Sequence, residues 1–175
     1  MPDRKHLILV GLPGAGKSTV GRAVASQLRL RFLDFDVEIT KREQLSIPEL
    51  FAAKGEPYFR ELERTLTAEL RDGRGMVLAP GGGWIANPGC LEALRARAIL
   101  VYLEVSPERA VARMGRGLTK RPLLMRPNPV EQATNLLAAR KELYLQSDHT
   151  VSTDLIARDE VVRLIVALAM AEQGG

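Results

Sequence analysis

One eight-residue segment near the amino terminus restricts the possible folds more than any other feature of the chain. It reads Gly-Leu-Pro-Gly-Ala-Gly-Lys-Ser over residues 11–18 and fits the phosphate-binding pattern G-x-x-x-x-G-K-[ST]. An apolar run, residues 6–10, precedes it, and a stretch with apolar residues at helical spacing, residues 18–28, follows it. This context predicts an α/β domain with a nucleotide triphosphate site, and a glycine-rich turn that binds nothing is the weaker alternative.

Each residue type in this loop is suited to holding phosphate. The glycines let consecutive backbone N–H groups turn toward one anion, and the helix that follows adds its positive end. Lys17 can reach the β- and γ-phosphates, and the Ser18 hydroxyl can complete the shell of a Mg²⁺ ion. The residues expected to bind ATP here are Gly14, Ala15, Gly16, Lys17, Ser18 and Thr19.

Bulk composition argues against several classes of protein. A chain of 175 residues can bury one sizeable core, so we expect a single domain over residues 1–175. The 25 Lys and Arg residues exceed the 21 Asp and Glu residues by only four and are scattered, which does not indicate nucleic-acid binding. Cys90 is the only cysteine, so we expect no disulfide framework and a reducing compartment. The apolar residues 7–12 are too few for a signal peptide or a membrane span, and the expected location is the cytoplasm.

Apolar runs alternate with helical-period segments along the chain, as in a parallel sheet covered on both faces. The predicted strands are residues 6–10, 31–34, 76–79, 99–105 and 149–152. The predicted helices are residues 18–28, 56–70, 88–97, 107–114, 129–146 and 159–172. We find no internal repeat.

Residues 115–128 lack any periodicity and are rich in glycine, proline, arginine and lysine. A basic, punctuated loop between two helices is typical of a mobile lid over phosphates. A plain solvated loop is an equal alternative on composition alone.

Two carboxylates, Asp34 and Asp36, follow the second predicted strand. The carboxyl ends of parallel strands open onto the ligand crevice, so both side chains are expected near the phosphate loop. One can support Mg²⁺, and the other can orient or deprotonate an attacking hydroxyl. Alternatively, Asp36 only caps a helix over residues 37–43.

A glycine triplet, Gly81, Gly82 and Gly83, follows the third predicted strand. It permits a ligand to approach backbone N–H groups closely, which is more than a tight turn needs. Arg60 and Arg140 lie in predicted helices, where solvent-facing charge is the simpler interpretation of each taken alone.

Seven short motifs, spread over nearly the whole chain, stand in an order and at spacings that are typical of one family. They are Gly-Leu-Pro-Gly-Ala-Gly-Lys-Ser-Thr at 11–19, Leu-Asp-Phe-Asp at 33–36, Ser-Ile-Pro-Glu-Leu-Phe at 46–51, Phe-Arg-Glu-Leu-Glu at 59–63, Gly-Gly-Gly at 81–83, Arg-Pro-Leu-Leu at 121–124, and Arg140 with Leu143-Tyr144. With these motifs the chain resembles the shikimate kinase family. The resemblance implies a P-loop fold like that of nucleoside monophosphate kinases, with a five-stranded parallel sheet in order 2-3-1-4-5 and a mobile lid at residues 115–128.

The resemblance also implies a reaction, in which the γ-phosphoryl group of ATP moves to the 3-hydroxyl of shikimate with Mg²⁺ as cofactor. It implies an acceptor-binding segment over residues 36–63 and a monomer that binds ATP and shikimate. The implied catalytic residues are Lys17, Asp36 and Arg121. Asp34 and Ser18 would hold the metal, Arg121 and Arg113 would contact ATP, and Arg113 is the weaker match, to an adenine-stacking residue.

For the acceptor, the resemblance implies that Arg60 and Arg140 clamp the shikimate carboxylate, that Glu63 braces Arg60, and that Gly82 contributes a backbone N–H. The full implied set is Asp36, Phe51, Phe59, Arg60, Glu63, Gly81, Gly82, Gly83 and Arg140. Two departures from the family pattern are Ala79-Pro80, where a hydroxyl residue is common, and Trp84, where a small or aliphatic residue is common. Trp84 is thus either a wall of the acceptor pocket or a core residue.

Three other interpretations remain. A kinase of the same fold could act on another hydroxylated acid such as gluconate, although Arg60, Arg140 and Asp36 suit a compact cyclic acid. A nucleoside monophosphate kinase lacks support because the longer base-binding segment is missing. A nucleotide-binding protein without catalysis is disfavoured by four intact residues, which are Lys17, Asp34, Asp36 and Arg121.

Overall fold

Five parallel strands form one sheet in a computed structural model that describes residues 4–73, 75–115 and 127–174. The order of the strands is β2-β3-β1-β4-β5, as the resemblance implied. Their bounds are His6–Val10 (β1), Arg31–Asp34 (β2), Met76–Ala79 (β3), Ala98–Glu104 (β4) and His149–Ser152 (β5). Every residue of β1 and β3 is buried, because helices cover both faces of the sheet.

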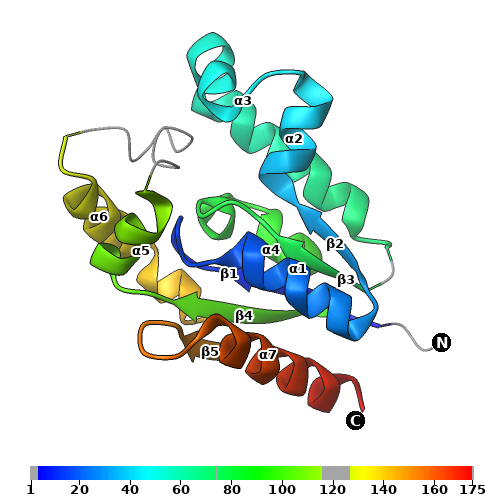
Figure 1. Ribbon diagram of the computed structural model, residues 1–175. Helices are drawn as coiled ribbons and strands as arrows, with labels where there is room; N and C mark the ends of the chain where they lie inside the picture. The colour runs from blue at the N-terminus through cyan, green and yellow to red at the C-terminus, as the bar shows by residue number, and fades with distance from the viewer. Residues whose placement is uncertain (1–3, 74, 116–126, 175) are drawn as a thin grey trace.

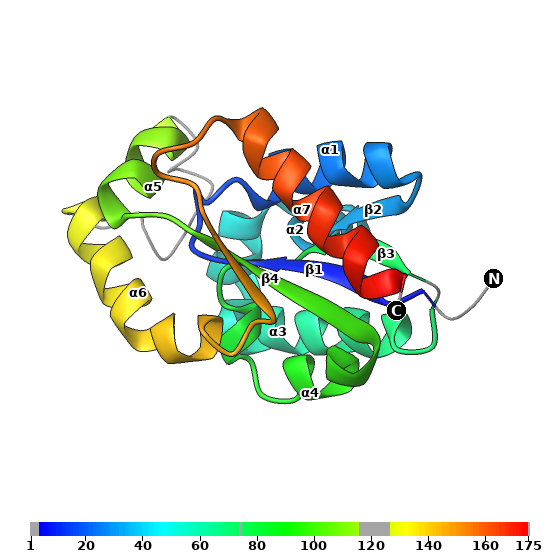
Figure 2. The same cartoon turned by 90° about the horizontal axis from the view of Figure 1, so that it is seen from below.

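Helices α1 and α7 pack on one face of the sheet, and α3 and α4 cover the other (Figures 1 and 2). The helix bounds are Lys17–Leu28 (α1), Phe35–Glu43 (α2), Ile47–Leu70 (α3), Cys90–Leu94 (α4), Pro107–Met114 (α5), Pro129–Tyr144 (α6) and Arg158–Gln173 (α7). Two short 3-10 helices are Trp84–Ala86 (η1) and Arg95–Arg97 (η2). None of the helices in the described part of the chain is both long and apolar enough to cross a bilayer.

The predicted strands are confirmed to within one residue at each end, whereas two helices begin elsewhere than predicted. Helix α2 starts at Phe35, since Asp34 is its N-cap and accepts from Val37 N at 3.2 Å. The interpretation of Asp36 as the cap of a helix over residues 37–43 is therefore wrong, and its side chain belongs to the first turn.

Helix α3 begins at Ile47, nine residues before the predicted start at residue 56. Ser46 and Glu49 form a reciprocal capping box at this end. Gly55, with φ 81° and ψ 168°, breaks the helix, so the prediction found only the half beyond the break. The predicted helix 88–97 is likewise shorter, as α4 and η2. The remaining helix ends differ from the predictions by one or two residues, within the usual fraying.

Candidate active site

Three loops meet beyond the carboxyl ends of β1, β2 and β3 because neighbouring parallel strands end at one edge of the sheet (Figure 1). They are the phosphate loop (residues 11–18), the turn from β2 into α2, and the glycine triplet (residues 81–83). Asp34 pairs with Ala79 across the β2 and β3 strands, so the acidic turn and the triplet start side by side. The sequence thus assembles a phosphate-binding loop, two carboxylates and a stretch of bare backbone at one edge.

The phosphate loop owes its shape to glycines with positive φ. Gly14 has φ 84°, and a Cβ there would lie 2.2 Å from the backbone oxygen of Ala110. Gly16 has φ 94° and is the N-cap of α1, and as a glycine it has no side chain with which to cap the helix. The amino end of α1 therefore receives no side-chain cap from its N-cap residue and faces the loop, as an anion site requires.

Lys17 is 9 % exposed, and its ammonium donates to the carbonyl oxygens of Gly11 and Leu12, both at 2.8 Å. The Lys17 ammonium is thus held against the backbone of the phosphate loop. Ser18 Oγ donates to the Asp34 carboxylate. The predicted phosphate and metal residues therefore lie together at the amino end of α1.

Oxygen ligands from Ser18 and Asp34 fit a hard cation such as Mg²⁺. In the described ranges there is no cluster of three or more His, Cys, Asp or Glu side chains that could hold a metal alone. This pattern agrees with Mg²⁺, which commonly takes one or two protein ligands together with substrate phosphates and water. Residue 79 offers only a methyl group, so the departure at Ala79-Pro80 leaves no hydroxyl at the end of β3.

All three carbonyl oxygens of the glycine triplet accept hydrogen bonds, whereas two of its N–H groups donate none to the described residues. In chain order, the three oxygens accept from Trp84 N at 3.0 Å, Tyr144 Oη at 2.8 Å and Ala86 N at 3.2 Å. The N–H groups of Gly82 and Gly83 donate to no atom within the described residues. An N–H points away from the carbonyl of its own peptide group, so these donors are turned away from the atoms that hold the triplet.

Glycine is favoured at positions 82 and 83 because neighbouring atoms lie very close to the backbone, and not because φ is positive. A Cβ on Gly82 would lie 2.8 Å from the ring of Pro13 in the phosphate loop. One on Gly83 would lie 2.5 Å from Nη2 of Arg60, whose guanidinium rests on this backbone. The phosphate loop and the Arg60 side chain therefore both contact the triplet.

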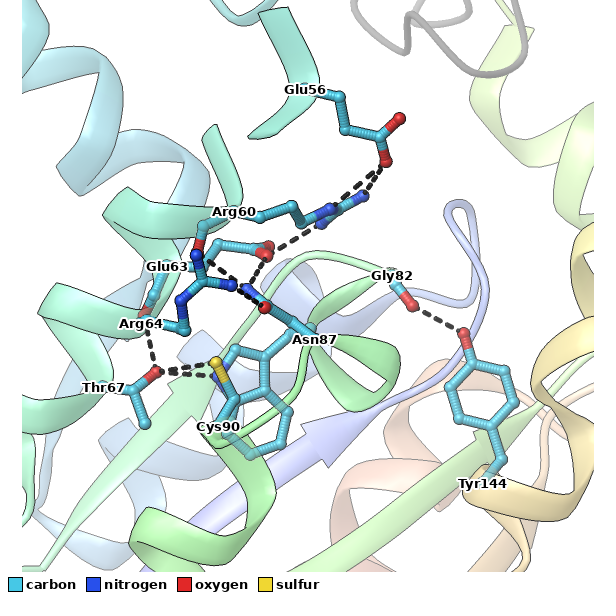
Figure 3. A network of polar contacts seen from close by, with 10 residues as sticks. Glu56, Arg60, Glu63, Arg64, Thr67, Gly82, Asn87, Cys90 and Tyr144 are labelled. Carbon is cyan, nitrogen blue, oxygen red and sulfur yellow. Dashed lines mark hydrogen bonds and ion pairs between the residues drawn. The ribbon is translucent and has the colours of Figure 1, made fainter. Parts of the chain in front are cut away.

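Arg60 is held in place by two carboxylates of its own helix (Figure 3). Its Nη1 donates to Glu63 at 2.8 Å and its Nη2 to Glu56 at 3.1 Å. Its guanidinium carbon lies 5.3 Å from the Phe59 ring centre, and the Phe59 ring lies 5.1 Å from that of Phe51. The predicted bracing of Arg60 by Glu63 agrees with these contacts, and Glu56 is a partner that sequence patterns missed.

Glu63 is fully buried, and Asn87 shares the task of fixing it. Asn87 Nδ2 donates to Glu63 Oε2 at 3.1 Å and to the Arg60 carbonyl at 2.8 Å, while its Oδ1 accepts from Arg64 at 2.7 Å (Figure 3). Glu63 Oε1 has no hydrogen-bond partner in the described part of the chain. It lies 3.3 Å from where a Cβ of Gly81 would be, as does Asp36 Oδ1.

Burial controls the charge of this pair. It raises the pKa of Glu63, against the lowering effect of Arg60, and the nearby Asp36 raises it further. Burial alone lowers the pKa of Arg60, but Glu63 and Glu56 outweigh it, and the net pKa is raised. The guanidinium therefore stays charged, while the carboxylate that holds it has an unusually high proton affinity for a glutamate.

Arg140 is 8 % exposed on α6 and lies one helical turn before the fully buried Tyr144. Tyr144 connects this helix to Gly82 through its hydroxyl (Figure 3). Helix α6 thus carries Arg140 and contacts the triplet through Tyr144, and the clamp formed by Arg60 and Arg140 stays a prediction. Neither Tyr144 nor Asn87 was assigned a role from the sequence, although Tyr144 follows Arg140 at helical spacing.

Three other predictions have different outcomes. Arg113 donates to the hydroxyl and carbonyl oxygens of Thr153 at 2.8 and 2.7 Å, so α5 is joined to the loop after β5, and its proposed adenine contact is not tested. Arg121 and most of the lid at residues 115–128 lie outside the described residues. Trp84 is fully buried, edge-on to Phe35 and bonded through Nε1 to Thr67 at 2.9 Å, so its role as a pocket wall is wrong.

The sequence profile described as "Shikimate kinase" matches residues 13–169. A shikimate kinase of Pseudomonas aeruginosa (strain LESB58) is 45 % identical over 150 residues, which is 85 % of this chain and 87 % of that protein. The chain belongs to the shikimate kinase family. A crystallised shikimate kinase from Acinetobacter baumannii, in complex with shikimate, superposes with a TM-score of 0.90 at 37 % identity, covering 96 % of this chain and 94 % of that one. A gluconokinase from Sinorhizobium meliloti, at 17 % identity and a TM-score of 0.62, shares the fold alone.

Proposed function

We propose that this member of the shikimate kinase family transfers the γ-phosphoryl group of ATP to the 3-hydroxyl of shikimate, giving shikimate 3-phosphate and ADP. The observation that carries the proposal is the joining of an anion-binding loop to a braced arginine. Gly82 packs on Pro13 while Gly83 supports Arg60, so a donor phosphate and an acceptor carboxylate would be held within one rigid corner. Family membership supports the same substrate pair.

The loop residues 14–19 would hold the ATP phosphates, with Lys17 supplying positive charge to the β- and γ-groups. Ser18 and Asp34 would hold Mg²⁺, which neutralises charge developing on the transferred group when it is bound. Arg121 on the lid would add further charge, as an arginine does in related phosphoryl-transfer enzymes. Arg113 would contact ATP near the adenine.

Asp36 would face the acceptor hydroxyl. As the shikimate oxygen bonds to the γ-phosphorus, the bond from that phosphorus to the leaving ADP oxygen breaks, and Asp36 accepts the hydroxyl proton. Arg60 and Arg140 would clamp the carboxylate, with the N–H groups of Gly82 and Gly83 beside them. The remaining acceptor wall would comprise Phe51, Phe59, Glu63 and Gly81.

The wider proposal covers organisation as well. The chain would act as one kinase domain over residues 1–175, with residues 36–63 receiving the acceptor and residues 115–128 closing over the phosphates, so that water is excluded from ATP. It would work as a monomer in the cytoplasm, where ATP is available. Light scattering of the purified protein tests the monomer directly.

A coupled assay of ADP release tests the reaction. Release should need both Mg²⁺ and shikimate and should vanish in Lys17→Ala with the fold retained. Equal release with and without shikimate, in folded protein, would refute the proposal. Substituting gluconate for shikimate in the same assay decides between the two acceptors, and we expect activity with shikimate only.

Calorimetry tests the carboxylate clamp. Arg60→Ala and Arg140→Ala should each weaken shikimate binding far more than ATP binding, since each removes charge-assisted hydrogen bonds of roughly 1.5–3 kcal/mol. Arg42→Ala is the control, because the ion pairs that Arg42 makes with described residues are those with Glu38 and Glu69 at the surface. Shikimate affinities equal to that of the control would remove both arginines from the site.

A further inference from the structure

The buried tyrosine at the end of α6 contacts the acceptor site from behind. Tyr144 is fully buried, and its ring stacks on that of Tyr102 with centres 4.9 Å apart and planes 10° from parallel. Its hydroxyl donates to the Gly82 carbonyl at 2.8 Å. The other two triplet carbonyls accept from backbone N–H groups of η1, so among the described contacts this is the one triplet carbonyl held by a side chain.

We propose that Tyr144 is a positioning residue for the acceptor, which aims the backbone N–H groups of the glycine triplet at bound shikimate by holding the Gly82 carbonyl. This inference rests on the proposed function. A trans peptide group is rigid, with its N–H directed opposite to its C=O, so the bond to Gly82 O fixes the direction of the Gly83 N–H. Glycine has no side chain to restrict rotation, and the triplet would otherwise sample other peptide orientations.

The chemistry of the hydroxyl suits a permanent donor. Burial raises the pKa of Tyr144, more than the nearby Arg140 guanidinium lowers it. The proton available to Gly82 O is therefore present throughout the physiological range. The stack on Tyr102 fixes the ring plane, so the hydroxyl has one position from which to donate.

Placement on the helix adds a second consequence. Arg140 lies four residues before Tyr144, on the same face of α6, and is itself nearly buried. Helix α6 thus carries both Arg140, which would bind the shikimate carboxylate, and Tyr144, which holds the Gly82 carbonyl. The helix that carries Arg140 is therefore joined to the triplet by the Tyr144 hydroxyl.

Tyr144→Phe tests the proposal because it removes the hydroxyl and keeps the stacked ring. Tyr102→Phe is the matched control, since it removes a hydroxyl from the partner ring and the Tyr102 hydroxyl bonds to no described residue. Shikimate and ATP affinities are measured by calorimetry, and melting temperature by scanning fluorimetry. We expect Tyr144→Phe to weaken shikimate binding about three- to tenfold, with ATP affinity within about twofold and Tyr102→Phe unchanged in both.

Two results would overturn the proposal: the same shikimate affinity in the two variants, or an equal loss of both ligands in Tyr144→Phe, which would mark general damage to the fold. A titration of wild-type protein labelled with ¹⁵N-glycine gives a measurement that does not depend on either variant folding. The Gly82 and Gly83 amide signals should move as shikimate is added, and stationary signals at saturation would also refute the proposal. Failure of wild-type protein to bind or phosphorylate shikimate at all would instead refute the proposed function.

Discussion

The two glycine-rich segments of the site, residues 11–16 and 81–83, follow neighbouring strands of one sheet but need glycine for different reasons. In the first, Gly11, Gly14 and Gly16 all have positive φ, so the backbone itself excludes other residues. In the second, no residue has positive φ, and each glycine instead makes room for a functional neighbour. Glycine-rich composition therefore gives one segment a backbone that only glycine adopts readily, and gives the other a backbone against which neighbouring side chains pack closely.

The largest effect is expected from strain in the first segment. Gly14→Ala would combine φ 84° with a Cβ 2.2 Å from the Ala110 oxygen, and backbone cannot yield as a side chain can. We expect kcat/KM for ATP to fall at least about a hundredfold, the scale on which an enzyme slows when one hydrogen-bond donor to the transition state is removed. Steady-state kinetics with ATP varied at saturating shikimate measures it.

Gly89→Ala is the control for positive φ alone. Gly89 has φ 89°, with nothing within 4 Å of its missing Cβ, and it lies at the start of α4 outside the site. This variant should lose about 1–2 kcal/mol of unfolding free energy and keep its kinetic constants. If Gly14→Ala kept its kinetic constants as Gly89→Ala does, the use of ATP would not depend on the backbone shape of the phosphate loop.

A substitution in the triplet is expected to have a smaller effect, and to impair the use of shikimate instead of ATP. Gly83→Ala puts a methyl group where Nη2 of Arg60 lies, and the flexible end of Arg60 moves while the backbone, at φ −89°, stays unstrained. Shikimate kcat/KM should fall roughly tenfold to a hundredfold, with KM for ATP within about twofold. An equal rise in both KM values would show that the two segments do not divide the substrates between them.

The smallest effect separates binding from stability at the carboxylate behind the triplet. Glu63→Gln keeps the shape but weakens the hold on Arg60, so shikimate affinity should fall about threefold. Because the folded pKa of Glu63 is raised above its ordinary value of 4.5, the ionised group costs stability at neutral pH, and that cost disappears as pH falls through the folded pKa toward 4.5.

The Gln variant should therefore be more stable than wild type at pH 7.5, and the difference should close as the pH falls toward 4.5. Urea unfolding of both proteins at the two pH values measures the difference. A variant less stable than wild type at pH 7.5 would mean that the Arg60 pairing outweighs the burial of Glu63.

Elements that are determined by neighbouring residues in the sequence could be predicted, and those determined by other contacts could not. The strands and the phosphate loop follow from short runs of residues and were predicted closely. The start of α2 was misplaced because Asp34 and Asp36 are both plausible caps, and only the backbone at Asp34, in an extended conformation, decides between them. Gly55 and Pro57 look like a helix start, yet a capped helical segment precedes them.

Contacts between distant segments were beyond such patterns. That Asn87 holds Glu63, and that Tyr144 holds Gly82, depends on packing between elements 24 and 62 residues apart. Trp84 follows the triplet directly, but η1 turns its ring into the core against Phe35. The resemblance to a family supplied the substrate and most site residues, which composition and periodicity alone did not give.

The single thiol has a practical consequence. Cys90 is fully buried at the start of α4, where burial raises its pKa to about 11, so only about one thiol in ten thousand is ionised at pH 7. Maleimides and oxidants react with the exposed thiolate, and the native chain should therefore behave as if it had no cysteine. Leu155, 89 % exposed in the loop after β5, offers a place where Leu155→Cys would take a spectroscopic label selectively, without first removing Cys90.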